Sequence, residues 1–145
     1  MLDVAHLITE LETGRYLANA TNVLLLGPPG VGKTHLAIGL GRKAIEFGYS
    51  CRFVHAADLA HQLIAASHHG ALEEAIALFA RPHLLIIDEL GYLPLEREAG
   101  HLLFHRVPPV GVRDLILGGS WSVRIQVPTL GNPGYSAVIP ARVAW

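Results

Sequence analysis

A glycine-rich segment near the start of the chain has the residue types and the spacing needed to bind phosphate groups. It matches the phosphate-loop (Walker A) pattern G-x-x-x-x-G-K-[ST] at Gly27, Gly32, Lys33 and Thr34. Glycine lacks the Cβ atom that blocks close approach, and it adopts positive φ readily, so successive N–H groups can point at phosphate oxygens. The helix expected from Lys33 adds the partial positive charge of its N-terminus. The pattern therefore predicts a site for a nucleoside triphosphate.

Individual residues of this segment have distinct expected roles. Lys33 would place a positive charge beside the β and γ phosphates, and the Thr34 hydroxyl would bind Mg²⁺. The alternative is a strand-to-helix turn that is rich in glycine for conformational reasons alone. The apolar strand expected before the loop and the helix expected after it favour phosphate binding. The predicted nucleotide-binding residues are Gly27, Pro28, Pro29, Gly30, Val31, Gly32, Lys33, Thr34 and His35.

A pair of carboxylates, Asp88 and Glu89, follows a run of four apolar residues. The carboxyl ends of parallel strands line the ligand crevice of an α/β sheet, so we expect Asp88 to lie near Thr34 and to bind Mg²⁺ directly or through water. Glu89 is placed to orient or deprotonate a water that attacks the γ-phosphate. The alternative is an acidic pair that only solvates a strand end. The phosphate loop earlier in the chain favours the functional interpretation, and the Asp-Glu pair favours water over a kinase-type acceptor as the nucleophile, which predicts a hydrolase.

The nine histidines and the single cysteine raise the question of a metal site. His101 and His105 have the spacing of a ligand pair on an expected helix, but no third ligand follows a recognisable pattern. His68 and His69 are expected in a solvated loop. Cys51 is expected in the core and not as a nucleophile. We therefore predict no structural metal site.

Composition excludes several classes of protein. The 145 residues are 51% hydrophobic and 16% charged, which is too apolar for a disordered chain and suits one domain. A net charge of −1 gives no overall attraction to nucleic acid, so DNA binding would need a local patch or an assembly. We find no apolar run of membrane-spanning length and no signal peptide, and a lone cysteine fits a reducing compartment. A cytoplasmic location is expected.

The hydrophobic pattern alternates between strand-like and helix-like segments. Strands are expected at 23–26, 51–54, 83–90 and 115–117, and helices at 1–12, 33–47, 58–66, 71–80 and 96–106. In the helix after the loop, Leu36, Leu40, Ala44 and Phe47 form the expected buried stripe, with Gly39 and Gly41 as close-packing positions. The predicted fold class is α/β, a P-loop NTPase with a parallel sheet flanked by helices and an incomplete C-terminal part. The expected regions are an N-terminal helix and connector at 1–21, a nucleotide-binding core at 22–118 and an irregular, divergent tail at 119–145.

Three segments, 22–37, 53–59 and 84–95, resemble the IstB-like ATP-binding proteins. The most specific feature is Gly91-Tyr-Leu-Pro-Leu directly after the acidic pair. The resemblance covers roughly residues 11–105; the family normally carries a further N-terminal segment, and the chain diverges after about Val107. The family comprises AAA+ ATPases that assist the transposases of bacterial insertion sequences, and it is similar to the DnaC helicase loaders.

The resemblance implies an AAA+ fold whose fourth strand lies between the first and the third. It also implies an oligomer that assembles on DNA with ATP and recruits a transposase. By position, residues 27–34 would bind the phosphates, Asp88 the Mg²⁺ and Glu89 the attacking water. Ser120 stands where the family has an asparagine near the γ-phosphate, and no counterpart of the family's arginine for the neighbouring subunit or of its helical lid follows Val107. Two alternatives stay open: a hydrolysis-deficient nucleotide-binding remnant and a helicase-loader-like adaptor in replication.

Overall fold

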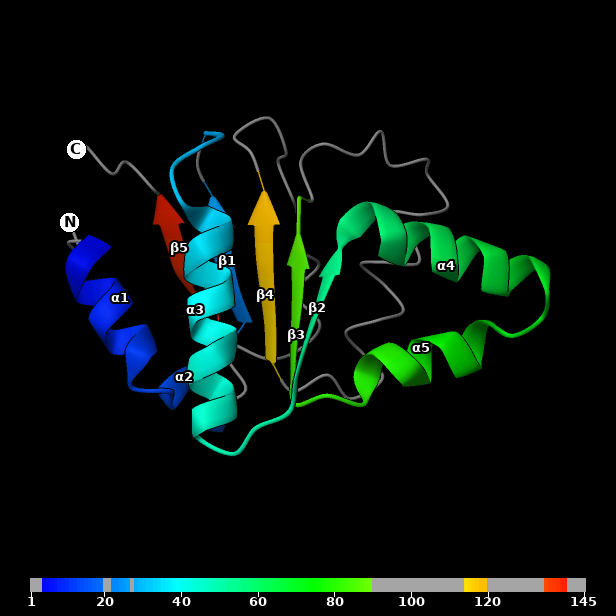
Figure 1. Cartoon of the computed structure of the whole chain (residues 1–145), viewed down its shortest axis with the longest axis horizontal. Helices are drawn as coiled ribbons and strands as arrows, with labels where there is room; N and C mark the ends of the chain where they lie inside the picture. Colours follow the sequence, from blue (N-terminus) through cyan, green and yellow to red (C-terminus); the bar gives the residue numbers. More distant parts are fainter. Residues whose placement is uncertain (1–3, 20–21, 27, 90–113, 120–134, 141–145) are drawn as a thin grey trace.

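Strands and helices alternate along the first 89 residues of the chain (Figure 1). The structure, a computed structural model, describes residues 4–19, 22–26, 28–89, 114–119 and 135–140. The helices are α1 (Val4–Glu12), α2 (Arg15–Ala18), α3 (Lys33–Glu46), α4 (Ala56–His68) and α5 (Leu72–Ala80). The strands are β1 (Asn22–Leu26), β2 (Cys51–His55), β3 (Leu84–Asp88), β4 (Asp114–Gly119) and β5 (Tyr135–Pro140). None of these helices is long and apolar enough to cross a membrane.

The five strands form one sheet in the order β2-β3-β4-β1-β5. Every neighbouring pair is parallel, so the carboxyl ends of all strands lie along one edge of the sheet (Figure 1). The predicted α/β class with a parallel sheet is confirmed, and so is the expected place of the fourth strand between the first and the third. This order puts β4 between the strand that leads into the phosphate loop and the strand that ends in Asp88.

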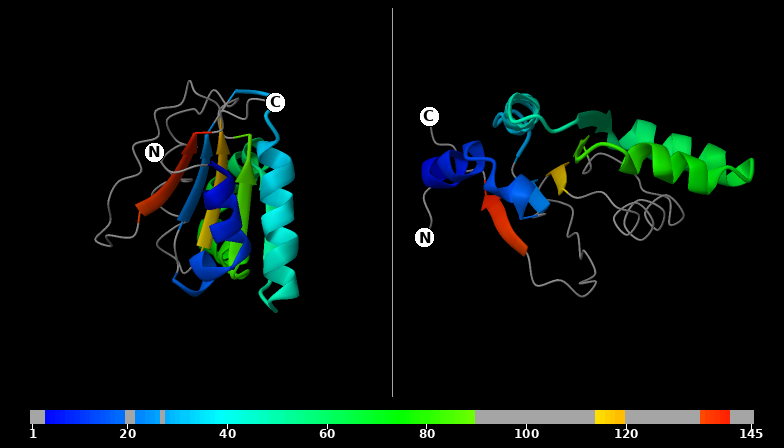
Figure 2. Two further views of the ribbon diagram at one scale, coloured as in Figure 1. Left: turned by 90° about the vertical axis from the view of Figure 1, so that its left-hand side faces the viewer. Right: turned by 90° about the horizontal axis from the view of Figure 1, so that it is seen from below.

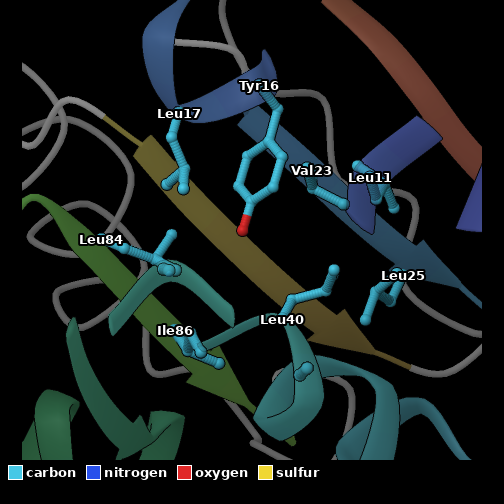
Figure 3. Close-up of a cluster of buried hydrophobic side chains, with 10 residues drawn as sticks. Leu11, Tyr16, Leu17, Val23, Leu25, Leu40, Leu84 and Ile86 are labelled. Atoms are coloured by element: carbon cyan, nitrogen blue, oxygen red, sulfur yellow. The ribbon is translucent and has the colours of Figure 1, made fainter. Parts of the chain in front are cut away.

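The core lies between the sheet and helices α1, α2 and α3, which share one side of it (Figures 1 and 2). All five residues of β3 are buried, as expected for an unbroken apolar strand with both faces covered. Helices α4 and α5 pack against each other and lie beside β2 (Figure 1). The buried cluster shown in Figure 3 comprises Leu11, Tyr16, Leu17, Val23, Leu25, Ala37, Leu40, Ala44, Leu84 and Ile86.

Helix α3 agrees with its predicted stripe only in part. Leu40 and Ala44 are buried, whereas Phe47 is 47% exposed, so its assignment to the buried stripe is wrong. Phe47 is the residue after the helix, and its ring lies beside the α1–α2 turn, 2.7 Å from a Cβ built on Gly14. The chain turns at Gly48, whose φ is 85°. The ring therefore packs at the end of the helix instead of beneath it.

The two glycines inside α3 differ in their surroundings. A Cβ built on Gly41 would lie 2.8 Å from Ile86 Cδ1 and 3.1 Å from Cys51 Sγ, so its predicted close packing is confirmed. A Cβ built on Gly39 meets nothing within 4 Å, so the same prediction is wrong there. Gly39 is exposed.

Other expectations need correction at element boundaries. The region expected as one helix and a connector at 1–21 contains a second helix, α2, and His68 closes helix α4 instead of lying in a loop. The tail expected to be irregular from residue 119 contains β5. A sheet edge tolerates proline, because an edge strand does not need every N–H donor. The predicted loop and helix at 91–106, including His101 and His105, and the region around Ser120 lie outside the described residues.

Candidate functional site

The loop between β1 and α3 requires glycine at two described positions. Gly30 has φ 79° and Gly32 has φ 89°, in the left-handed region that other residues rarely adopt. A Cβ built on either one meets nothing within 4 Å, so the requirement comes from backbone conformation and not from crowding. Gly32 directly precedes α3, whose first N–H groups lack partners within the helix. This is the backbone geometry that the Walker A pattern predicts; Gly27 lies outside the described residues.

Lys33 folds back over its own loop. Its Nζ donates a hydrogen bond of 2.7 Å to the carbonyl oxygen of Pro28. Burial lowers the pKa of Lys33 from its ordinary value of 10.5, and the negative charge of Asp88 partly opposes that effect. The ammonium group of Lys33 is thus held against the loop backbone, and it interacts electrostatically with the carboxylate of Asp88.

Thr34 and Asp88 are in direct contact. The Thr34 hydroxyl donates a hydrogen bond of 2.7 Å to a carboxylate oxygen of Asp88. Asp88 ends β3 and is 3% exposed, the one buried charged side chain among those whose burial the structure describes. Thr34 lies in the first turn of α3. The predicted proximity is confirmed, and it brings together two oxygen groups of the kind that Mg²⁺ prefers.

Glu89 faces a different neighbour. Its Oε2 lies 3.5 Å from Nδ1 of His55, and both side chains are about half exposed. Glu89 is also the one described non-glycine residue with positive φ, at 61°. His55 ends β2 and pairs in register with Asp88. His55 is not among the predicted site residues, although a histidine directly after an expected strand is placed at the edge where ligands bind.

The remaining predicted site residues lie along the same loop and helix. Pro28, Pro29 and His35 are exposed, and Val31 is partly buried. Cys51 is partly buried, and burial raises the pKa of its thiol, which disfavours the reactive thiolate. Among the described residues, no group of three or more histidine, cysteine, aspartate or glutamate side chains could hold a metal ion.

Proteins of bacterial insertion sequences are similar to this chain. It is 48% identical over 97 residues to an IS5376 protein of Geobacillus stearothermophilus, covering 67% of this chain and 39% of that protein. It is 42% identical over 97 residues to an IS21 protein of Pseudomonas aeruginosa, covering 67% of this chain and 37% of that protein. Both relatives are named for ATP binding. The chain thus spans less than half the length of either protein.

Solved structures of replication proteins share the fold. AMPPCP-bound DnaA from Aquifex aeolicus matches with a TM-score of 0.67 and 23% identity, covering 83% of this chain and 39% of that one. The DnaC helicase loader matches with a TM-score of 0.66 and 20% identity, covering 85% of this chain and 74% of that one. At such identities the likeness concerns the fold alone, and it confirms the predicted P-loop AAA+ class.

The family assignment rests on most of the chain. Residues 2–118 match the family described as IstB-like ATP binding protein. This stretch includes the phosphate loop, the buried Asp88 and all but the last residue of the central strand β4. The chain belongs to the IstB-like ATP-binding proteins of insertion sequences.

Proposed function

We propose that the chain binds ATP together with Mg²⁺ at the loop between β1 and α3. The hydrogen bond between Thr34 and Asp88 carries this proposal, because it joins the phosphate-loop hydroxyl to a buried carboxylate at the carboxyl edge of a parallel sheet. The phosphates would lie along the backbone of residues 27–32 and the first turn of α3, as far as His35. Lys33 would exchange the Pro28 carbonyl for the β and γ phosphate oxygens.

The residues present fit a hard cation. Thr34 and Asp88 supply a hydroxyl and a carboxylate oxygen, and the two groups already lie within hydrogen-bond distance. Bound Mg²⁺ would neutralise negative charge on the β and γ phosphates. Asp88 would also keep its negative charge near Lys33, so the ammonium group stays above the loop.

Hydrolysis of ATP to ADP and phosphate is the reaction that we assign to this site. A bond would form between a water oxygen and the γ-phosphorus, the bond to the β–γ bridging oxygen would break, and the proton of the water would pass to Glu89. Nucleotide binding without hydrolysis is the second candidate. It is favoured by the contact of Glu89 with His55, which occupies the carboxylate that the reaction needs.

For the whole protein we propose that ATP drives assembly of a homo-oligomer on DNA that assists a transposase in the cytoplasm. Family membership and the insertion-sequence relatives support this role. An adaptor function in replication is less well supported, because the likeness to DnaA and DnaC is one of fold. Co-purification with a transposase or with a replicative helicase distinguishes the two.

Thermal unfolding with and without Mg-ATP tests the binding proposal. A ligand at about a hundred times its Kd stabilises a native protein by roughly 2.7 kcal/mol, so Mg-ATP should raise the Tm. Lys33→Ala should abolish most of the rise. Lys43→Ala is the matched control, because Lys43 lies on the same helix and pairs with Glu46 on the surface. A wild-type Tm that does not respond to Mg-ATP would refute the proposal.

A further inference from the structure

Helix α3 exposes two isoleucines with an arginine between them. Ile38 is 45% exposed and Ile45 is 59% exposed, although both side chains are large and apolar. Arg42, also exposed, follows Ile38 by four positions and precedes Ile45 by three, so the three side chains lie along one side of the helix. Together they form the α3 stripe, an apolar surface with a positive charge at its middle.

Helix α5 exposes a smaller stripe of the opposite charge. Leu78 is 44% exposed, and Glu74, four positions earlier, is exposed as well. Residues four positions apart are neighbours on the surface of a helix, so a leucine and a carboxylate lie side by side here. These two residues form the α5 stripe.

The charges of both stripes are unused within the described part of the chain. Among the described residues, neither Arg42 nor Glu74 has an ion pair or a side-chain hydrogen bond. Lys43, the next residue of α3, instead pairs with Glu46 at 3.1 Å. Each stripe therefore combines exposed apolar surface with a charge that an opposite charge on another molecule could neutralise.

The two stripes also match in spacing. If Glu74 faces Arg42, Leu78 lies one helical turn away, and the α3 stripe has an isoleucine about one turn from Arg42 in either direction. Leu78 thus meets Ile38 or Ile45 whether the two helices run parallel or antiparallel. Within one copy α3 packs on the sheet, whereas α5 packs on α4 beside β2, so the stripes lie apart (Figures 1 and 2).

We propose that the α5 stripe of one copy docks on the α3 stripe of a second copy of this chain. The inference rests on the homo-oligomer of the proposed function and names the surfaces that hold it together. Opposite charge and matched apolar positions favour a second copy as the occupant, because each copy carries both stripes. Docking buries the exposed isoleucines and the leucine and pairs the two charges.

Sedimentation velocity of the full chain with Mg-ATP at low ionic strength, over a range of concentrations, tests this contact. Arg42→Glu and Glu74→Lys should each raise the Kd of self-association about tenfold or more, because like charges then face each other. An equimolar mixture of the two variants should associate nearly as well as the wild type, since the altered stripe of each fits the altered stripe of the other. Leu78→Ser should weaken association without a change in net charge. Arg15→Glu and Glu12→Lys are the matched controls, because both residues are exposed and lie on other helices.

The outcomes separate the inference from the function on which it rests. Association like that of the wild type in either Arg42→Glu or Glu74→Lys, with a normal Mg-ATP thermal shift, overturns the docking and leaves the proposed homo-oligomer in place on another surface. Weakened variants that do not recover on mixing overturn the docking too, because the two charges then do not face each other. A wild type that stays monomeric at every concentration while Mg-ATP raises its Tm overturns the docking and the proposed homo-oligomer and leaves nucleotide binding intact.

Discussion

The hydroxyl oxygen of Thr34 lies 2.7 Å from a carboxylate oxygen of Asp88, although the two residues are 54 positions apart in the sequence. The contact links the first turn of α3 to the end of β3 across the carboxyl edge of the sheet. It brings the two proposed Mg²⁺ ligands together from distant parts of the sequence.

Thr34→Val should destabilise the native protein by about 1–3 kcal/mol. The substitution keeps the shape of the side chain and removes the donor to a buried carboxylate, which is then left with an unmet desolvation cost. Urea denaturation measures the change in the free energy of unfolding. Thr34→Ser keeps the hydroxyl and should lie near the wild type; equal stability of the valine and serine variants would contradict the prediction.

The stability of the wild type relative to Lys33→Met should increase as the pH rises toward 10.5. Burial lowers the pKa of Lys33 in the folded protein, with the Asp88 charge opposing the shift only in part. Between the lowered pKa and 10.5 the unfolded chain holds more protons on this group than the folded chain, so the free energy of unfolding rises with pH.

Urea denaturation of both proteins between about pH 8 and 10.5 measures this effect, because all other titrating groups are common to the pair. Lys43→Met is the control: it removes a surface lysine of α3, so it shows how much of the pH-dependent difference in unfolding free energy arises from losing any lysine of this helix. A wild type that loses stability relative to Lys33→Met over this range would show that the sign is wrong.

Alanine should have opposite effects at the two glycines of α3. Gly39→Ala should stabilise the protein by about 0.5–1 kcal/mol, since the position is helical and open. Gly41→Ala should destabilise it by about 1–2 kcal/mol, because the new methyl group presses on Ile86, which is buried and cannot move freely.

Thermal or urea unfolding gives the order of the three proteins. In an Ile86→Val background, which lacks the Cδ1 atom in question, the cost of Gly41→Ala should shrink. An equal cost in both backgrounds would mean that another contact causes the strain.

Glu89→Gly should be more stable than Glu89→Ala by about 1 kcal/mol. Both variants lose the carboxylate and the contact with His55, so they differ only in backbone preference. A left-handed φ costs a non-glycine residue roughly 1–2 kcal/mol, whereas glycine adopts it freely. At a position with negative φ, the glycine variant would have the lower free energy of unfolding. A denaturation experiment in which Glu89→Ala is more stable than Glu89→Gly would therefore contradict the observed φ.

Much of the site could be predicted because its signals are local. The spacing from Gly27 to Thr34 specifies a loop and a helix start, and an apolar run before Asp88 specifies a buried strand. The rule that parallel strands end at one edge then predicts the contact between Thr34 and Asp88. The β/α alternation of the first 89 residues follows from hydrophobic periodicity in the same way.

The parts that could not be predicted depend on long-range placement. Pairing of His55 with Glu89 requires β2 to be the neighbour of β3 in the observed register, which no local pattern encodes. The strand Tyr135–Pro140 is not predicted, because proline usually disfavours a strand. At the edge of the sheet, where β5 lies, a strand tolerates proline. Phe47 was misplaced because a helical stripe does not reveal where the helix ends.

The place of β4 in the middle of the sheet has a consequence for biosynthesis. A nascent chain that has left the ribosome only as far as Glu89 already carries the phosphate loop and both acidic residues, but β1 and β3 have no strand between them to pair with. Emergence of residues 114–119 supplies that strand, and distant pairings of this kind form late. Competence to hold a nucleotide should therefore arise in one step, when translation passes this strand.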